Sequence, residues 1–327
     1  MKIAVFSTKS YDRLFLEKLN ERRHEITFFE VGLDLHTSEL AKGYQGVCVF
    51  VNDKVDAETI NKLSENGVKL IALRCAGFNN VDINAAREKN ISVLRVPAYS
   101  PDSVAEHALA LILTLNRKTH KAFNRIRENN FSLEHLMGFN LKGKIVGVIG
   151  TGRIGSVFSE IMLGIGCKVI AYDISEAEEL KAKGVRYTPL EELLIESDII
   201  SLHCPLNPHT HHLINKEAFS KMKTGVMLIN TCRGGVVDTK EAIRALKSRK
   251  LGYLGIDVYE QEENLFFRDL SNQIVDDDLI ARLMSFPNVL ITAHQGFFTE
   301  EAMTQIAMQT LQNISDFETG KKSGYGV

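Results

Sequence analysis

Short apolar runs that alternate with polar, helix-forming stretches are the feature of this sequence that most restricts its fold. In the first hundred residues these runs are 2–6, 25–31, 46–51, 68–74 and 91–97. Helical segments of about 10–15 residues separate most of them, which is typical of a parallel sheet with crossover helices. Because the runs are continuously apolar, both faces of the sheet should be covered.

A second and larger series of the same kind follows. Its apolar runs are 144–150, 168–173, 185–187, 198–204, 225–231, 251–258 and 288–293. A final helix is predicted from Thr299, with apolar residues at helical spacing from 303 to 317. This helix can return to the first series, which would make the first α/β unit discontinuous in sequence.

A long helix is predicted between the two series. Ser103-Val-Ala-Glu106 fits a capping box, and Pro101 just upstream would give a rigid entry. Residues 104–115 are apolar nearly all round, so we expect this helix to be buried between two domains or between two subunits.

Composition restricts the class of protein further. The 327 residues suffice for two domains, and the apolar (44%) and charged (24%) fractions are those of a globular protein. The net charge of −2 gives no indication of nucleic acid or of an anionic membrane surface. No run is long enough for a membrane span or a signal peptide. The cysteines are odd in number and scattered, which predicts reduced thiols in the cytoplasm.

The glycine motif Gly150-Thr-Gly152-Arg-Ile-Gly155 is the strongest local signal. It follows an apolar run, opens a helical stretch, and is followed about 20 residues later by Asp173 at the end of the next run. Gly150 permits the tight turn, Gly152 lets backbone approach a pyrophosphate, and Gly155 allows close packing of helix on strand. An acidic side chain at Asp173 binds ribose hydroxyls and repels a 2′-phosphate. The motif therefore predicts a dinucleotide site that prefers NAD to NADP.

Charged or ionisable residues follow three of the predicted strands. Arg233 follows the run 225–231, Glu260 and Glu262 follow 251–258, and His294 follows 288–293. Ligands of open parallel sheets bind outside the carboxyl ends of the strands, so these groups should converge on the dinucleotide crevice. An arginine can bind a carboxylate through two hydrogen bonds. A histidine whose imidazolium is favoured by a nearby carboxylate can donate a proton.

A group of histidines, His209, His211 and His212, suggests a metal site at first sight. Adjacent histidines need special geometry to share one ion, and no carboxylate or thiolate pattern near them in the sequence completes a ligand set. We therefore interpret this segment as a solvated loop and expect no metal.

Together these motifs resemble the D-isomer-specific 2-hydroxyacid dehydrogenase family over essentially the whole chain. The segment from Asp257-Val-Tyr-Glu-Gln-Glu262 to His294-Gln-Gly-Phe-Phe-Thr299 is similar to the fermentative D-lactate dehydrogenases of that family, notably at Phe266-Phe267 and Asp277-Asp278. The resemblance implies a Rossmann-type NAD-binding domain (residues 100–298) inserted in a flavodoxin-like substrate domain (residues 1–99 plus 299–327).

The resemblance also assigns site residues. The catalytic positions of the family match Arg233, Glu262 and His294. Glu262, not Glu260, has the family's spacing from Asp257. Substrate contacts match Ala76, Gly77 and Tyr99, together with Arg233 and His294. NAD contacts match Gly150, Gly152, Arg153, Ile154, Gly155, Asp173, Cys204, Pro205, Thr210, Thr231, Cys232, Arg233 and Asp257.

The implied reaction is reduction of pyruvate to D-lactate with NADH. Two alternatives remain open on the sequence. One is the same chemistry on glyoxylate, hydroxypyruvate, a branched-chain 2-keto acid or phenylpyruvate. The other is an NAD-responsive binding protein, similar to the corepressors that share this fold. The family also implies a homodimer through the helix at 104–115, or a dimer of such dimers.

Overall fold

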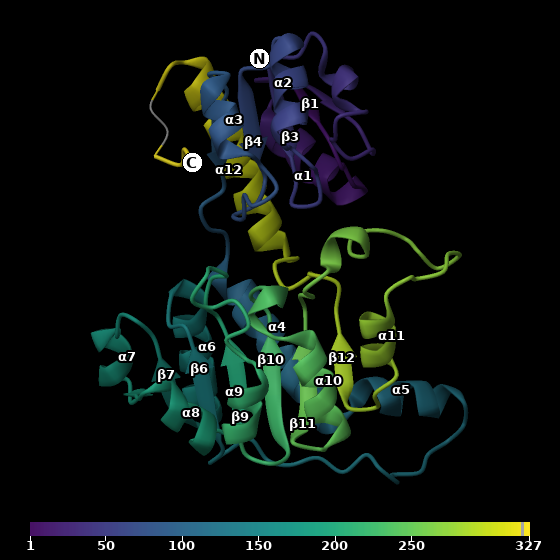
Figure 1. The fold of residues 1–327 in the computed structure, drawn as a ribbon, viewed down its shortest axis with the longest axis vertical. Helices are drawn as coiled ribbons and strands as arrows, with labels where there is room; N and C mark the ends of the chain where they lie inside the picture. Colours follow the sequence, from purple (N-terminus) through teal and green to yellow (C-terminus); the bar gives the residue numbers. More distant parts are fainter. Residues whose placement is uncertain (322–323) are drawn as a thin grey trace. The chain divides into compact units, whose positions relative to one another are not determined.

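Two parallel sheets organise the chain in the computed structural model, which describes residues 1–321 and 324–327 (Figure 1). Contacts divide the chain into unit 1, residues 1–100 with 298–327, and unit 2, residues 101–297. Every apolar run expected to form a strand contains one, and the predicted α/β class is confirmed. Among the described residues, no helix combines the length and hydropathy needed to cross a bilayer.

Unit 1 contains a five-stranded sheet with the order β2-β1-β3-β4-β5. Its strands are β1 (Lys2–Val5), β2 (Glu25–Phe28), β3 (Gly46–Val49), β4 (Leu70–Leu73) and β5 (Ser92–Arg95). All neighbouring pairs are parallel, and this order is that of flavodoxin-like sheets.

Helices cover both faces of this sheet. They are α1 (Ser10–Asn20), α2 (Ala57–Glu65), α3 (Ile83–Glu88) and α12 (Glu300–Glu318), with a 3₁₀ turn η1 at Ser38–Ala41. Alternate residues of β1 point to opposite faces: Ile3 belongs to the core formed with α1 and α12, and Ala4 to the core formed with α2 and α3. The predicted final helix thus packs in unit 1, with Thr299 as its N-cap.

Unit 2 contains a seven-stranded parallel sheet with the order β12-β11-β10-β9-β6-β7-β8. Its strands are β6 (Ile145–Ile149), β7 (Lys168–Tyr172), β8 (Arg186–Tyr187), β9 (Ile199–Leu202), β10 (Val226–Asn230), β11 (Leu251–Ile256) and β12 (Val289–Ile291). The order reverses at β6, as in dinucleotide-binding sheets, and all carboxyl ends lie at one edge.

Two helical layers enclose this second sheet, and each has its own apolar core. One layer contains α4 (Pro101–Arg117), α6 (Arg153–Ile165) and α7 (Glu178–Ala182). The other contains α8 (Leu190–Glu196), α9 (Lys216–Lys221), α10 (Thr239–Lys247) and α11 (Asp278–Met284). Two 3₁₀ turns, η2 (Gly234–Val236) and η3 (Glu262–Asn264), lie in the loops after β10 and β11.

The long helix α4 differs from the prediction at its start. It begins at Pro101, so Ser103 lies inside its first turn and the predicted capping box is wrong; a proline is favoured at this first position because its missing N–H would have no partner there. Only one face of α4 is buried, through Ala108, Ile112 and neighbouring residues packed within unit 2, while Leu113 on the other face is 40% exposed.

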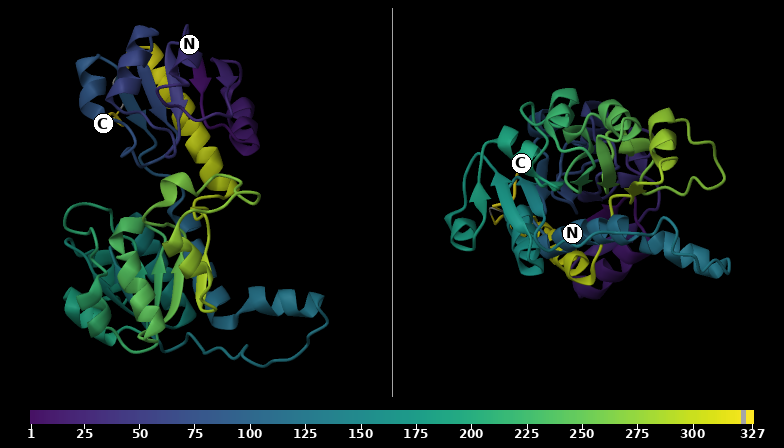
Figure 2. Two further views of the ribbon diagram at one scale, coloured as in Figure 1. Left: turned by 45° about the vertical axis from the view of Figure 1, so that its right-hand side comes forward. Right: turned by 90° about the horizontal axis from the view of Figure 1, so that it is seen from below.

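After α4, the chain forms an arm that projects from unit 2: α5 (Thr119–Arg127) and the segment that follows it to Gly138 (Figure 2). Within the described structure, α5 buries none of its residues. Large apolar side chains along the arm are exposed: Phe123, Ile126, Phe131, Leu133 and Met137.

Candidate active site

The loop after β6 has the geometry of a dinucleotide-binding turn. Gly150 follows the strand with a φ of +92°, which L side chains rarely adopt. A Cβ atom on Gly155 would lie 1.9 Å from the carbonyl oxygen of Gly150, so a glycine is required for α6 to pack this close to the turn. Arg153 and Ile154 begin the helix, whose first N–H groups can therefore face a ligand at the carboxyl edge of the sheet.

Two further observations at this loop fit a nucleotide cofactor. A Cβ built on Gly152 meets no atom of the described residues within 4 Å, so this backbone is open to close approach by a ligand. Asp173 follows β7, and its Oδ2 accepts a hydrogen bond from Thr151 N at 2.5 Å and a second from Thr151 Oγ1 at 3.2 Å. A carboxylate fixed beside the glycine turn suits the ribose hydroxyls of NAD.

The neighbouring loops after β9 and β10 carry the other cofactor candidates. Thr210 Oγ1 donates to the carbonyl oxygen of Pro205 at 2.6 Å, which folds the loop after β9 back on itself. Thr231 Oγ1 is buried and has no hydrogen-bond partner among the described residues, so it can serve a ligand. A hydrogen bond with Cys232 lowers the pKa of Cys204, whereas burial raises the pKa of Cys232.

Arg233 lies in the turn after β10. Its Nη1 donates to the preceding carbonyl oxygen at 2.6 Å, and its own carbonyl oxygen accepts from Asn230 Nδ2 at 2.9 Å. A Cβ on the next residue, Gly234, would lie 2.1 Å from the carbonyl carbon of Tyr259. The backbone that carries Arg233 therefore packs directly against the loop that leads to Glu262.

Glu262 and His294 form a hydrogen-bonded pair. Glu262 Oε1 lies 2.8 Å from His294 Nδ1, and Glu262 Oε2 accepts from Tyr259 N at 2.8 Å. The side chains are 22% and 18% exposed, so both are accessible from solvent. His294 adopts a φ of +54°, an uncommon conformation for a residue other than glycine, and one that often occurs at functional sites. With Nδ1 engaged by the carboxylate, Nε2 is left for a ligand, which is the arrangement of an acid–base pair.

Asp257 anchors the loop that carries His294, a role that sequence reasoning missed. The buried carboxylate accepts hydrogen bonds from Thr292 Oγ1 (2.6 Å), Gln295 N (2.9 Å) and Gly296 N (2.7 Å). Its backbone carbonyl accepts from the N–H of His294 at 2.7 Å. Burial opposes ionisation, but hydrogen bonds from His107 and Thr292 outweigh it and hold the pKa of Asp257 below its usual range.

The predicted site residues divide between the two units. Arg233, Glu262, His294 and all the cofactor candidates lie in unit 2, at or just beyond the carboxyl ends of its strands. Ala76, Gly77 and Tyr99 lie in unit 1. There, Arg95 Nη1 donates to the carbonyl oxygen of Ala76 at 2.8 Å. The thiol of Cys75 donates to the carbonyl oxygen of Gly77 at 3.2 Å. The loop after β4 is therefore held in a defined conformation.

Comparison with known proteins gives the class to which this fold and site belong. Residues 109–296 match the NAD-binding domain of the D-isomer specific 2-hydroxyacid dehydrogenases. The chain belongs to that family, and it is an NAD-dependent oxidoreductase.

Individual relatives are similar over nearly the whole chain. The D-lactate dehydrogenase of Escherichia coli K12 is 50% identical over 322 residues, which are 98% of each chain. Among solved structures, the pyruvate reductase of Chlamydomonas reinhardtii has a TM-score of 0.96 at 47% identity, over 99% of this chain and 98% of its own. The D-lactate dehydrogenase of Aquifex aeolicus, solved with NAD and lactic acid, has a TM-score of 0.88 at 36% identity, over 99% and 98%.

Proposed function

We propose that this enzyme reduces pyruvate to D-lactate with NADH, and catalyses the reverse reaction, with Arg233, Glu262 and His294 as its catalytic residues. The observation that carries the proposal is the 2.8 Å pair of Glu262 and His294 at the carboxyl edge of the sheet that also bears the glycine turn. The relatives named D-lactate dehydrogenase and pyruvate reductase support the choice of substrate.

His294 is the proposed proton donor. The chemistry supplied by bound NADH is a hydride ion for C2 of the keto acid. As negative charge develops on the C2 oxygen, the imidazolium of His294 donates its Nε2 proton to that oxygen, which yields the hydroxyl of lactate and a neutral ring. Glu262 accepts the Nδ1–H of the ring throughout, so it fixes the orientation of the ring and favours the imidazolium. In the reverse direction, the neutral ring takes the hydroxyl proton.

Arg233 is proposed to bind the 2-keto acid. A guanidinium can donate to a carboxylate and to the neighbouring carbonyl oxygen, and it remains charged at every physiological pH. The resemblance to the family assigns the other substrate contacts to unit 1: the backbone N–H groups of Ala76 and Gly77 for the carboxylate, and Tyr99 for the pocket wall. The restrained loop after β4 supports this assignment, because a preorganised loop binds at a lower entropic cost.

The proposed NAD contacts rest on the glycine turn, the open backbone at Gly152 and the buried, unpartnered hydroxyl of Thr231. The backbone N–H groups of Arg153 and Ile154, at the start of α6, would face the pyrophosphate. Asp173 would accept hydrogen bonds from the ribose hydroxyls. The remaining proposed contacts are Gly150, Gly155, Cys204, Pro205, Thr210, Cys232, Arg233 and Asp257. Since Asp257 already accepts three hydrogen bonds within its own loop, it would act on the nicotinamide chiefly through the position of that loop.

Steady-state turnover with NADH on a panel of 2-keto acids tests the proposal. Pyruvate should give the highest kcat/KM and a product that is the D enantiomer. Higher kcat/KM on glyoxylate, hydroxypyruvate, a branched-chain acid or phenylpyruvate would reassign the substrate within the family. Negligible turnover on every acid, with NADH still bound, would favour a binding protein and overturn the proposal.

A homodimer is the proposed assembly, and the apolar arm after α4 supports it. Ile126, Leu133 and Met137 are 54%, 82% and 87% exposed, and such clusters on a surface mark sites of association. Leu113, on the outer face of α4, is also exposed. Light scattering should give the mass of a dimer, or of a dimer of dimers. The double variant Leu133→Glu, Met137→Glu should give a monomer, and an unchanged mass would exclude the arm as the interface.

We also propose that the enzyme acts in the cytoplasm, in fermentative metabolism. Cys48 and Cys204 are buried, and buried thiols of this kind persist in a reducing compartment.

A further inference from the structure

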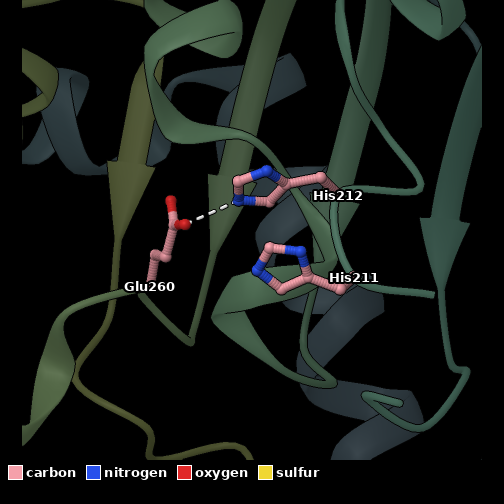
Figure 3. Close-up of side chains that lie close together, drawn as sticks. All are labelled: His211, His212 and Glu260. Carbon is pink, nitrogen blue, oxygen red and sulfur yellow. Dashed lines mark hydrogen bonds and ion pairs between the residues drawn. The ribbon is translucent and has the colours of Figure 1, made fainter. Parts of the chain in front are cut away.

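A cluster of three potential metal ligands lies at the carboxyl edge of the unit 2 sheet. His211 and His212 belong to the loop after β9, and Glu260 belongs to the loop after β11 (Figure 3). No local sequence pattern predicts a carboxylate beside these histidines, because Glu260 is 48 residues from His212 in the chain. The fold therefore brings a third potential ligand to the two histidines.

The three side chains lie close together, and the two imidazole rings are stacked. One ligand atom from each lies within 4.8 Å of the other two. His212 Nε2 is 2.6 Å from Glu260 Oε1, and the two imidazole rings stack with their centroids 4.0 Å apart. Each ring presents a nitrogen on the side that faces Glu260 (Figure 3). His211 is exposed, while the side chains of His212 and Glu260 are 32% and 26% exposed, so an ion can reach the cluster from solvent.

The backbone around the histidines is held in place. His212 has a φ of +51°, and its N–H donates to the carbonyl oxygen of Gly235 at 2.8 Å. The N–H of His211 donates to the backbone carbonyl oxygen of Asn207 at 2.9 Å. On its second nitrogen, His212 Nδ1 lies 3.8 Å from Asp238 Oδ2. A carboxylate beside the nitrogen that does not bind metal is typical of metal-binding histidines, because it orients the ring.

We propose that His211, His212 and Glu260 form a binding site for a divalent transition-metal ion of the zinc type. Two imidazoles and one carboxylate are a ligand set that suits Zn²⁺ and Co²⁺ and disfavours Mg²⁺ and Ca²⁺, which prefer oxygen ligands. In this site the ion takes the place of the proton now shared between His212 Nε2 and Glu260 Oε1. Water completes a tetrahedral coordination shell, as is usual where a protein supplies three ligands.

Little movement is needed to close the site. Ligand atoms bound at about 2.1 Å in a tetrahedral shell are about 3.4 Å apart. The ring of His211 must therefore move closer to the other two ligands, while His212 Nε2 and Glu260 Oε1 must separate slightly from their present 2.6 Å. The exposed side chain of His211 can approach by rotation, and loss of the proton between His212 Nε2 and Glu260 Oε1 lets these two atoms separate. The bound ion links the loop after β9 to the loop after β11, and Glu260 lies two residues before Glu262. The ion would therefore restrain the loop that carries Glu262.

Binding of Co²⁺ and Zn²⁺ to the full-length protein tests this proposal independently of dehydrogenase activity. The protein is prepared without a histidine tag, freed of metal with a chelator, and titrated with Co²⁺ while visible absorption is recorded. His211→Phe keeps the ring stacking but removes the nitrogen ligand, and Glu260→Gln keeps the volume but removes the charge. His209→Ala is the matched control, because His209 belongs to the same exposed loop but not to the cluster.

The wild type and His209→Ala should bind one Co²⁺ per chain, with visible bands of tetrahedral nitrogen and oxygen ligation and without a thiolate charge-transfer band. Zn²⁺ should displace the Co²⁺ and raise the melting temperature of both proteins. His211→Phe and Glu260→Gln should each weaken Co²⁺ binding by at least about tenfold. Wild-type affinity in both variants, a thiolate charge-transfer band, or the absence of Co²⁺ binding to the wild type would overturn the proposal.

Discussion

Replacing Asp257 with asparagine should loosen the loop that carries His294. The carboxylate is 1% exposed and is the shared acceptor for Thr292, Gln295 and Gly296, the residues on either side of His294. Asparagine has nearly the same shape as aspartate, but it has no charge and carries an NH₂ group in place of one oxygen. If its oxygen faces Thr292 and Gln295, its NH₂ faces the N–H of Gly296, and two donors oppose each other.

The magnitude follows from the bonds that are lost. A hydrogen bond to a charged acceptor contributes about 1.5–3 kcal/mol, and a buried donor left without a partner costs about 1–3 kcal/mol. One charged bond is lost, and two become neutral and weaker. We therefore expect the free energy of opening of this loop to fall by about 3 kcal/mol, which corresponds to a roughly 100-fold change in the opening equilibrium.

The effect should depend on pH. The pKa of Asp257 is lowered in the folded protein, chiefly by His107 and Thr292 acting against burial. Its charge therefore stabilises the fold above the pKa of an unfolded aspartate, about 3.9, and this contribution is lost as the pH falls through the lower folded-state value. Asp257→Asn lacks the contribution at every pH. The difference between wild type and variant in the free energy of loop opening should be constant above about pH 5 and should become smaller below about pH 4.

Hydrogen–deuterium exchange of the peptide 288–297, read by mass spectrometry, measures the opening of this loop. Exchange in Asp257→Asn should be about 100-fold faster at neutral pH, and pyruvate turnover should fall because His294 loses its fixed position. Asp276→Asn is the control, since Asp276 is exposed and its substitution should be nearly neutral. Wild-type exchange in Asp257→Asn, or a difference that does not narrow in acid, would refute this account of the loop.

Other predictions follow from the same site. His294→Gln should lower kcat for pyruvate reduction by about 10²–10⁴-fold without changing NADH affinity measured by fluorescence, and a kcat near that of the wild type would exclude the proposed role. Gly155→Ala would place a Cβ 1.9 Å from the carbonyl oxygen of Gly150, so both the melting temperature and NADH binding should fall. In Gly152→Ala the added Cβ has open space around it, so NADH binding should fall and the melting temperature should not. Equal losses of melting temperature in the two alanine variants would contradict this interpretation of the turn. Asp173→Asn should raise the use of NADPH relative to NADH, and an unchanged ratio in steady-state assays would count against its ribose contact.

The sequence located the strands because periodicity is a local signal, but it extended most of them too far. The run 198–204, for example, forms a strand only at Ile199–Leu202, since Cys204 already belongs to the loop above the sheet edge. The predicted start of α4 is wrong because two N-terminal signals lie close together. Ser103 and Glu106 have capping-box spacing, yet the fixed φ of Pro101 already suits the first helical turn, and the helix begins there.

The proposed catalytic pair could be predicted in two steps. Parallel strands bring their carboxyl ends to one edge, which indicated His294 and either Glu260 or Glu262, and the resemblance to the family selected Glu262. The anchoring by Asp257 and the pairing of His212 with Glu260 were not accessible in this way. Both depend on how loops bend after they leave the sheet, and in both the partners are more than 30 residues apart in the chain. No local pattern predicts which side chains such loops bring into contact.

The pH dependence of pyruvate reduction by Glu262→Gln tests the central claim most directly. Reduction needs the imidazolium of His294, so activity declines as the pH rises and the ring loses its proton. Without the carboxylate on Nδ1 the imidazolium is less favoured, and the decline should move to lower pH. Glu263→Gln changes an exposed neighbour and should leave the profile unchanged. An acid shift in Glu262→Gln alone is the predicted result, and a wild-type profile in that variant would contradict the proposed roles of both residues.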